Sequence, residues 1–347
     1  MRSNPAADAR LVRAPKEVRA AFSEQPDPRG SELAVFDTSG KRVDAGGTAA
    51  SDEPNGLRVS LAAIGDGGYT VAWTVLSTVD GHTTRGSFAF AVGDAPLPKI
   101  ADVGQEVSPP APFELAGRFL SFAGIALALG VAAFGLAVRA FADAPAQRRE
   151  QLVLALAGGL LVAGSVALLL DQGGRAPPRL TALLGIRGLA GVTILGGAAA
   201  FAPTRLRLVA LAAGVVAAMT ATLVSHAAAT GGARDVALDL AHLLAVSVWA
   251  GGVVAMLAIA IPSSSDGDAD LGRTVWRFSL VALASVGALV ATGTLQAFDR
   301  LVLIEDLVET PYGIALLAKI VLLAITLVLG ALNLLAWGPR LRAAADA

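Results

Sequence analysis

The chain has 347 residues, of which 54% are hydrophobic and 16% are charged, and its formal net charge is −1. Soluble domains usually carry about 25% charged residues, so this composition indicates that much of the chain lies in lipid. The lack of cysteine excludes disulfides and thiolate metal sites, and a net charge near zero gives no reason to expect a nucleic-acid partner.

Residues 1–93 are predicted to form an all-β domain. Turn-forming residues such as Asn55-Gly56 and Gly67-Gly68 separate short apolar runs, which are Val18–Phe22, Leu33–Phe36, Leu57–Leu61, Tyr69–Val75 and Phe88–Val92. In the last two runs every second residue is large and apolar, as in a strand with one buried face. This spacing is typical of a small immunoglobulin-like β-sandwich.

The sequence Asp80-Gly81-His82 lies between the last two apolar runs. In an extended segment, residues two apart point the same way, so the carboxylate and the imidazole can bind one ion. Oxygen and imidazole ligands suit a divalent transition metal such as Cu(II) or Zn(II) better than magnesium or calcium. A solvated turn with a surface histidine would produce the same short pattern.

Residues 94–112 contain five prolines and are predicted to form a stiff, extended linker. Residues 113–347 are predicted to form an all-α transmembrane bundle, because they contain seven apolar segments near the roughly 20 residues that span a bilayer. These segments cover about 115–140, 150–170, 180–202, 205–227, 235–261, 274–298 and 312–337. Arginines follow the odd-numbered segments, which predicts that the C-terminus is cytoplasmic and that residues 1–112 lie outside the plasma membrane.

Two of the three histidines, His226 and His242, lie near the outer ends of the fourth and fifth predicted spans. Asp235, Asp239 and His242 follow an i, i+4, i+7 pattern and so share one helical face. Met219 lies seven residues before His226, about 10 Å deeper in the membrane. The donors therefore change with depth from oxygen to imidazole and then to thioether. This is the order that suits Cu(II) being reduced to Cu(I).

Simpler explanations of these residues stay open. Asp235 and Asp239 would also favour the dipole at a helix start, and Met219 would also serve as lipid-facing filler. A histidine within a span is costly to bury, which favours a functional role for His242. Three polar residues in the sixth span offer a different route through the membrane: Thr292, Thr294 and Gln296.

The third and seventh predicted spans resemble each other weakly, and Arg187 in the first matches Lys319 in the second. A basic residue at this depth costs a few kcal/mol unless it is paired or reaches the interface. No P-loop, serine nucleophile elbow or zinc-protease helix occurs, so the sequence does not predict an enzyme.

Two sets of motifs carry a resemblance to known families. The first set is Ser3-Asn4-Pro5-Ala6, Ala14-Pro15, Phe22-Ser23-Glu24, Gly68-Tyr69-Thr70-Val71, Trp73, Ser77, Asp80-Gly81-His82 and Gly86-Ser87-Phe88. With these motifs, residues 3–92 resemble the CopC copper-binding domain. The second set is Ser225-His226, His242-Leu243-Leu244, Trp249-Ala250-Gly251-Gly252, Arg277-Phe278-Ser279, Thr292-Gly293, Thr310-Pro311-Tyr312-Gly313 and Lys319. With these, the chain from about residue 115 resembles the CopD membrane protein, so the whole resembles a CopC–CopD fusion.

The CopC resemblance implies a Cu(II) site made by an N-terminal histidine, a DxH pair and sometimes the glutamate of an FSE motif. Here the implied ligands are Asp80, His82 and Glu24, and the histidine would lie a few residues before Met1. CopD-type proteins usually have eight spans, one more than the seven predicted from hydropathy.

The sequence as a whole predicts a copper-handling membrane protein. An external Cu(II)-binding sandwich would deliver copper to a helical bundle that imports it, with Cu(I) deeper in the membrane. The expected partners are copper, the lipid bilayer and extracytoplasmic copper chaperones. Two alternatives are a membrane-anchored copper buffer or sensor, which needs His82 alone, and a b-type haem carrier with His226 and His242 as axial ligands.

Overall fold

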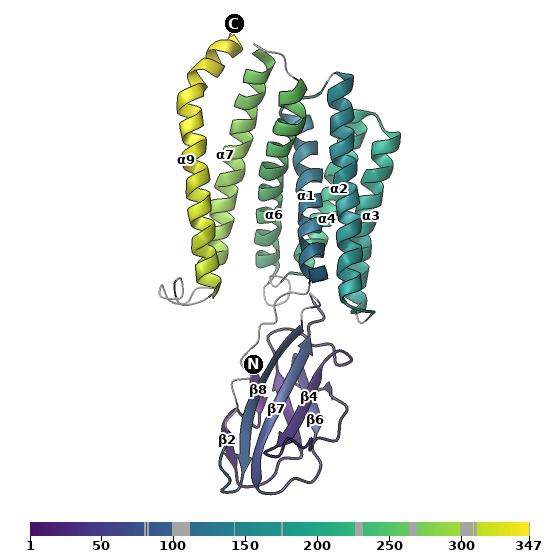
Figure 1. Cartoon of the computed structure of the whole chain (residues 1–347), viewed down its shortest axis with the longest axis vertical. Coiled ribbons are helices and arrows are strands. Elements are labelled where there is room, and N and C mark those ends of the chain that lie inside the picture. Colours follow the sequence, from purple (N-terminus) through teal and green to yellow (C-terminus); the bar gives the residue numbers. More distant parts are fainter. Residues whose placement is uncertain are drawn as a thin grey trace. The chain divides into compact units, whose positions relative to one another are not determined.

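The computed structural model describes residues 1–79, 81, 83–98, 112–141, 143–174, 176–225, 232–263, 269–298, 308 and 311–346. These residues form two compact units. The first comprises Met1–Ala116, Ala167–Gly185 and Leu223–Gly232, and the second comprises Gly117–Val166, Ile186–Thr222 and Ala233–Ala347. Figure 1 labels the helices and the strands β2, β4, β6, β7 and β8. Most of the predicted linker, residues 99–111, lies outside the described residues.

Two four-stranded sheets form the predicted β-sandwich within residues 2–92 (Figure 1). One sheet has the order β1-β3-β6-β5 and the other β2-β8-β7-β4, and only β2 and β8 pair in parallel among these neighbours. The bounds are β1 Arg2–Asn4, β2 Ala9–Leu11, β3 Glu17–Ala21, β4 Glu32–Asp37, β5 Ala49–Ala50, β6 Gly56–Ser60, β7 Gly67–Leu76 and β8 Thr83–Val92. The five apolar runs form β3, β4, β6, β7 and β8, so the all-β prediction is confirmed.

The core of the sandwich lies between the two sheets. Val18 and Leu57 from one sheet pack with Val71 and Phe90 from the other, and all four side chains are buried. Burying each such side chain contributes about 1.5–3 kcal/mol. Tyr69 stacks on Phe90 with ring centroids 5.3 Å apart, and its hydroxyl donates to the carbonyl oxygen of Gly65 at 2.9 Å. All strands of both sheets and this core lie within residues 1–93, so this segment has the requirements for folding alone.

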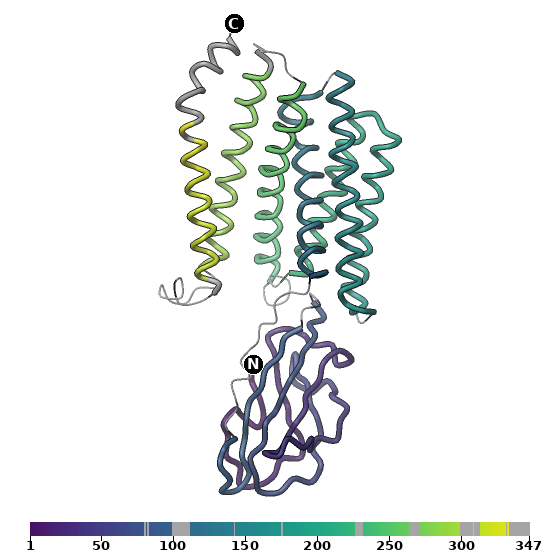
Figure 2. Tube along the Cα trace, viewed as in Figure 1, coloured from purple at the N-terminus to yellow at the C-terminus, as the bar shows by residue number. Residues whose placement is uncertain are grey.

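Seven helices in the described part of the chain are long and apolar enough to cross a membrane. Their bounds are α1 Pro112–Ala137, α2 Ala144–Asp171, α3 Pro178–Ala200, α4 Pro203–Leu223, α6 Ala233–Ala255, α7 Ala269–Phe298 and α9 Pro311–Asp346. After α6 the chain continues as a π-helix, Met256–Ala260, and a short 3₁₀ turn, Ile261–Ser263. The predicted number of spans is confirmed for these residues, and Figure 2 traces the chain through them.

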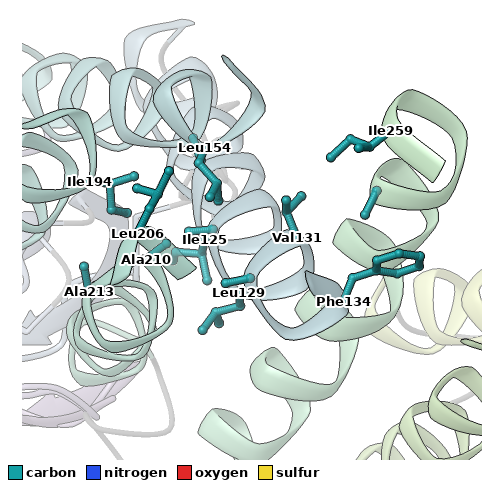
Figure 3. Packing of buried hydrophobic residues seen from close by; sticks show 14 of the residues in the cluster. Ile125, Leu129, Val131, Phe134, Leu154, Ile194, Leu206, Ala210, Ala213 and Ile259 are labelled. Atoms are coloured by element: carbon teal, nitrogen blue, oxygen red, sulfur yellow. The ribbon is translucent and has the colours of Figure 1, made fainter. Parts of the chain in front are cut away.

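The centre of the helical unit is packed with apolar side chains (Figure 3). Ile125 of α1, Leu154 of α2 and Ile194 of α3 are fully buried there. Helix α1 also crosses α6 closely at Gly130 and Gly251, where a side chain on either glycine would collide with the backbone of the other helix. Small residues allow this approach because, in lipid, packing rather than hydrophobic burial drives helix association.

A buried ion pair ties α2 to α4. Arg207 donates from Nε and one terminal nitrogen to the two carboxylate oxygens of Glu150, at 2.7 and 2.8 Å, and both side chains are buried. Gly135 on α1 makes room for the pair, since an added Cβ there would lie 2.7 Å from the Glu150 Oε1 atom. The two buried charges therefore neutralise each other within the bundle.

Candidate metal sites

The first candidate site is the connection between β7 and β8. Asp80 and His82 lie outside the described residues, but the residues around them define where the connection is held. The backbone N–H and the hydroxyl of Thr78 both donate to the carbonyl oxygen of Gln25, at 2.9 and 3.0 Å. Gly81 has φ +72°, a conformation that favours glycine, and its N–H donates to the carbonyl oxygen of Ser77 at 3.1 Å.

These hydrogen bonds place the third predicted ligand beside the same connection. Glu24 directly precedes Gln25, so the backbone of Glu24 lies close to Thr78, which is two residues before Asp80 in sequence. The N–H of Asp27 also donates to the carbonyl oxygen of Leu76, at 2.8 Å, which fixes the segment after Glu24 to the end of β7. The sequence motifs did not reveal this proximity, because 53 residues separate Gln25 from Thr78.

The N-terminal strand runs toward the same place. In the antiparallel pair of β1 and β3, Arg2 is opposite Ala21. A chain extended backward from Met1 would continue alongside Phe22 and Ser23 toward Glu24. The histidine that the CopC resemblance implies ahead of Met1 stays a prediction.

Trp73 on β7 supplies a natural reporter close to this site. Its ring packs edge-on against Phe22, with centroids 5.3 Å apart, and the absence of a side chain at Gly86 leaves room for it. Trp73 lies three residues before Leu76, or about 10 Å along the strand from the end of β7. It is the only tryptophan in residues 1–93.

The second candidate site is on α6, where His242 faces α7. The Nδ1 atom of His242 lies 2.9 Å from the hydroxyl oxygen of Thr292. That hydroxyl donates its single proton to the carbonyl oxygen of Ala288, one turn earlier on α7, at 2.7 Å. With its proton directed to Ala288, the hydroxyl oxygen accepts from Nδ1, and in this tautomer the Nε2 atom of neutral His242 keeps a free lone pair. An imidazole held in this way is ready to bind a metal.

Polar and charged groups surround His242. Gln296, one turn after Thr292 on the same face of α7, has a buried Nε2 atom without a hydrogen-bond partner among the described residues. Asp239 on α6 and Lys319 on α9 both act electrostatically on the His242 ring. Thr294 is exposed, so only part of the predicted polar patch of α7 turns inward.

The predicted cation-collecting residues lie at the start of α6. Asp235 is in the first turn and is partly buried, 3.6 Å from the guanidinium of Arg234. Asp239 lies one turn further along and is also partly buried. The i, i+4, i+7 arrangement with His242 is retained because α6 is a regular helix over this range.

The structure says less about the other two predicted membrane ligands, His226 and Met219. His226 lies outside the described residues. Met219 on α4 is 38% exposed on the surface of the helical unit. Helix α1 packs against both helices of the predicted site, through Gly214 of α4 and Gly251 of α6. The shared role of His226 and Met219 in binding copper stays a prediction.

A second thioether is better buried. Met256 is 8% exposed and begins the π-helix that follows α6. It lies 14 residues after His242, about four helical turns, so the two side chains point to nearly the same face about 21 Å apart. The 14-residue spacing of His242 and Met256 is visible in the sequence, so their shared face could have been predicted from it. π-Helical segments occur frequently at functional sites. Among the described residues, no three His, Asp or Glu side chains gather as a metal-binding group.

The fold and these sites define a class: a small β-sandwich joined to a multi-pass helical membrane region, each with a candidate imidazole ligand. The family model of the CopC domain matches residues 1–93, and that of copper resistance protein D, CopD, matches residues 272–347. The chain is thus a CopC–CopD fusion, as its motifs predicted.

Two individual proteins are similar to the chain. It is 27% identical to the copper transport protein CutJ of Bacillus subtilis (strain 168) over 384 aligned residues, which cover 96% of this chain and 67% of that protein. It is 30% identical to CopC from Methylosinus trichosporium OB3b, whose crystal structure covers 27% of this chain and 91% of its own, with a TM-score of 0.25.

Proposed function

We propose that the protein binds Cu(II) at the β7–β8 connection of its CopC domain and imports copper through its CopD-type helices. The observation that carries this proposal is the hydrogen bond between His242 and Thr292, which leaves a free imidazole nitrogen inside the membrane region. A buried imidazole with one nitrogen fixed and the other free is the arrangement in which histidines bind metals. The CopC–CopD match and the similarity to CutJ favour copper as that metal.

The first step is capture of Cu(II) outside the membrane. Asp80, His82 and Glu24 supply two carboxylates and one imidazole, and the Gln25–Thr78 hydrogen bonds support their convergence. Three such ligands leave a tetragonal Cu(II) site incomplete. A histidine ahead of Met1 would complete it, since its amine and imidazole would arrive along Phe22 and Ser23.

The second step is entry into the membrane. Asp235 and Asp239 concentrate cations at the mouth of the helices, and His242 and His226 accept copper below them. Met219 and Met256 are the two thioethers within the membrane helices, and a thioether suits copper that reaches it as Cu(I), after a one-electron donor outside this chain has reduced it. The arginines that follow the odd-numbered predicted spans support an external sandwich and a cytoplasmic C-terminus. Extracytoplasmic copper chaperones are the expected donors to the sandwich.

The test is cellular copper uptake by the full chain with His242→Ala. We expect uptake to be lost while the protein still inserts in the membrane and still binds Cu(II) in its CopC domain. Thr294→Val is the matched control, because Thr294 is exposed on α7 near the same level. Normal uptake by His242→Ala would overturn the membrane route.

Two further measurements separate the alternative functions. A buffer or sensor would lose copper binding on His82→Ala and would show no uptake that depends on His242. A haem carrier would show a Soret band in the purified protein that disappears on His242→Ala. The free Nε2 atom of His242 suits an iron ligand as well as a copper ligand, so this spectrum is a direct discriminator.

A further inference from the structure

A second buried polar cluster lies in the four-helix part of the membrane unit, away from His242. Arg187 on α3 is only 3% exposed, yet it has no acidic partner among the described residues. Its Nε atom donates to the hydroxyl of Thr220 on α4 at 3.1 Å, and its buried NH2 group has no hydrogen-bond partner in the described part of the chain. The Thr220 hydroxyl is already committed, since it donates to the carbonyl oxygen of Ala217 at 2.7 Å.

Two serines on the neighbouring helices also lack hydrogen-bond partners. The hydroxyl groups of Ser121 on α1 and Ser165 on α2 are buried and have no hydrogen-bond partner among the described residues. Ser121 and the backbone of Gly164 are in close contact, and an added Cβ at Gly188 would lie 3.9 Å from the Ser165 hydroxyl. Gly164 precedes Ser165 in sequence, and Gly188 follows Arg187. The packing of α1, α2 and α3 at these glycines therefore links the serines to the arginine.

The three groups also lie at a similar depth. Ser121 and Arg187 are each nine residues from the start of their helices, or about 13 Å along the axis. Ser165 is six residues from the end of α2, or about 9 Å. Buried positions on α3 such as Leu184 and Ile194 flank Arg187 on the face that points into the bundle. The arginine therefore points toward the centre of α1–α4 rather than to lipid.

The charge balance distinguishes this cluster from the ion pair of the same unit. The fully buried charged side chains in the described membrane helices are Glu150, Arg187 and Arg207. Glu150 and Arg207 neutralise each other, which leaves Arg187 with one uncompensated positive charge. The charge of Arg118 on α1 acts on Arg187, and it is also positive. A buried charge requires a partner, and none of the protein groups described supplies one.

We propose that Arg187, Ser121 and Ser165 bind a small monovalent anion such as chloride. All three groups offer hydrogen-bond donors and the guanidinium carries a positive charge, so the cluster suits an anion better than a metal cation. One bound monovalent anion neutralises the single excess charge. The small side chains of this layer favour a halide over a bulky anion. This site is separate from the copper route and does not depend on it.

The test uses the purified full chain in detergent, with copper removed by a chelator. Chloride replaces gluconate at constant ionic strength, and thermal unfolding is followed at each concentration. We expect a saturable rise in Tm of at least about 2 °C for the wild-type protein, because an anion that binds only the folded state stabilises it. Bromide should act as chloride does. An unchanged Tm would overturn the proposal.

Substitutions assign the effect to this cluster. Arg187→Met should abolish the chloride response, whereas Arg205→Met, which removes an exposed arginine of α4, should retain it. If Arg187→Met does not fold, the double substitution Ser121→Ala with Ser165→Ala decides the question. It should raise the chloride concentration for half-maximal stabilisation at least about tenfold, the loss expected for a hydrogen bond to a charged group. A wild-type response in the double variant would overturn the assignment.

Discussion

His242 and Thr292 are 50 residues apart in sequence, yet the Nδ1 atom of the first lies 2.9 Å from the hydroxyl oxygen of the second. When the proton of that hydroxyl is directed to the carbonyl oxygen of Ala288, at 2.7 Å, the hydroxyl oxygen accepts from Nδ1. Thr292 therefore acts as a positioning residue, which selects the tautomer of His242 and presents its Nε2 atom. This relationship makes a histidine on α6 dependent on a threonine on α7.

Replacing Thr292 by valine tests that dependence. Valine has nearly the same shape as threonine but cannot accept the Nδ1 proton, so the imidazole loses its fixed orientation. We expect copper uptake at limiting copper to fall about tenfold or more, the usual effect of removing such a partner. Thr292→Ser retains the hydroxyl and should recover most of the uptake. Equal uptake by the valine and serine variants would contradict the positioning role.

Asp235 and Asp239 should matter chiefly at low copper. Two carboxylates near the entrance raise the local cation concentration, and more copper in the medium offsets their loss. The double substitution Asp235→Asn with Asp239→Asn should slow uptake at low copper and leave the maximal rate little changed. Raising the ionic strength should slow the wild-type protein more than the variant, because salt screens these charges. An unchanged rate at low copper and low salt would exclude cation collection.

The sandwich site can be tested on residues 1–93 by Cu(II) titration with Trp73 fluorescence. Bound Cu(II) should quench this tryptophan, which lies about 10 Å along the strand from the connection. Residues 1–93 should bind Cu(II) weakly, because their site is incomplete, and we expect His82→Ala to abolish this binding and Glu24→Gln to weaken it about tenfold. A chain extended at its N-terminus by a terminal histidine should bind more tightly, since the added amine and imidazole complete the tetragonal site.

The matched control for this titration is Glu32→Gln. Glu32 is an exposed carboxylate on β4 that pairs with Arg42. Its replacement changes the net charge of the sandwich by the same amount as Glu24→Gln. If both glutamine variants weaken Cu(II) binding equally, Glu24 acts through overall charge and is not a ligand.

The sequence predicted most of the fold because its strongest pattern is hydropathy. Long apolar segments identify the membrane helices, and alternation identifies β3, β4, β6, β7 and β8. The short strands β1, β2 and β5 escaped prediction, since two or three residues carry no period and depend on pairing with their neighbours. Helix α9 continues to Asp346, beyond the predicted end of its span, because a helix does not end where the membrane pattern ends.

The sites were predictable only as residue types. The DxH pair and His242 stand out in the sequence as candidate ligands, because their side chains suit a transition metal and lipid disfavours a buried histidine. Their partners, Gln25 with Thr78 and Thr292 with His242, depend on contacts between distant segments. The sequence identifies Arg187 as a costly charge. The missing hydrogen-bond partners of the two nearby serine hydroxyls can be recognised only once the helices are packed.

The stability of the sandwich should depend on pH through Asp44. This buried carboxylate accepts hydrogen bonds from the backbone N–H groups of Val35 and Gly46, at 2.8 and 2.9 Å, and pairs with Arg42. Burial opposes its ionisation, but these hydrogen bonds outweigh burial, so the pKa of Asp44 is lowered from its usual value. A carboxyl with a lowered pKa stabilises the fold above its unfolded pKa of about 3.9. That stabilisation is lost as the pH falls through the folded pKa.

Urea unfolding of residues 1–93 at pH 7 and pH 3 measures this contribution. Asp44→Ala should reduce the free energy of unfolding at pH 7 by about 1–3 kcal/mol, because the buried N–H of Val35 loses its acceptor. At pH 3 the wild-type protein should approach the variant. If the difference between them is the same at both pH values, the ionised form of Asp44 is not the source of the stability.

The two membrane thioethers can be separated by substitution with leucine, which preserves volume and removes the soft donor. Met256 is 8% exposed and shares a helical face with His242, whereas Met219 is 38% exposed. If Cu(I) is held below His242, the thioether on that route must face the interior. We therefore expect Met256→Leu to reduce copper uptake more than Met219→Leu, with both variants inserting normally. Supplying copper as Cu(I) should leave the difference in place, because the loss lies in a Cu(I) ligand and not in reduction. A larger loss with Met219→Leu would instead place the route along α4, beside His226.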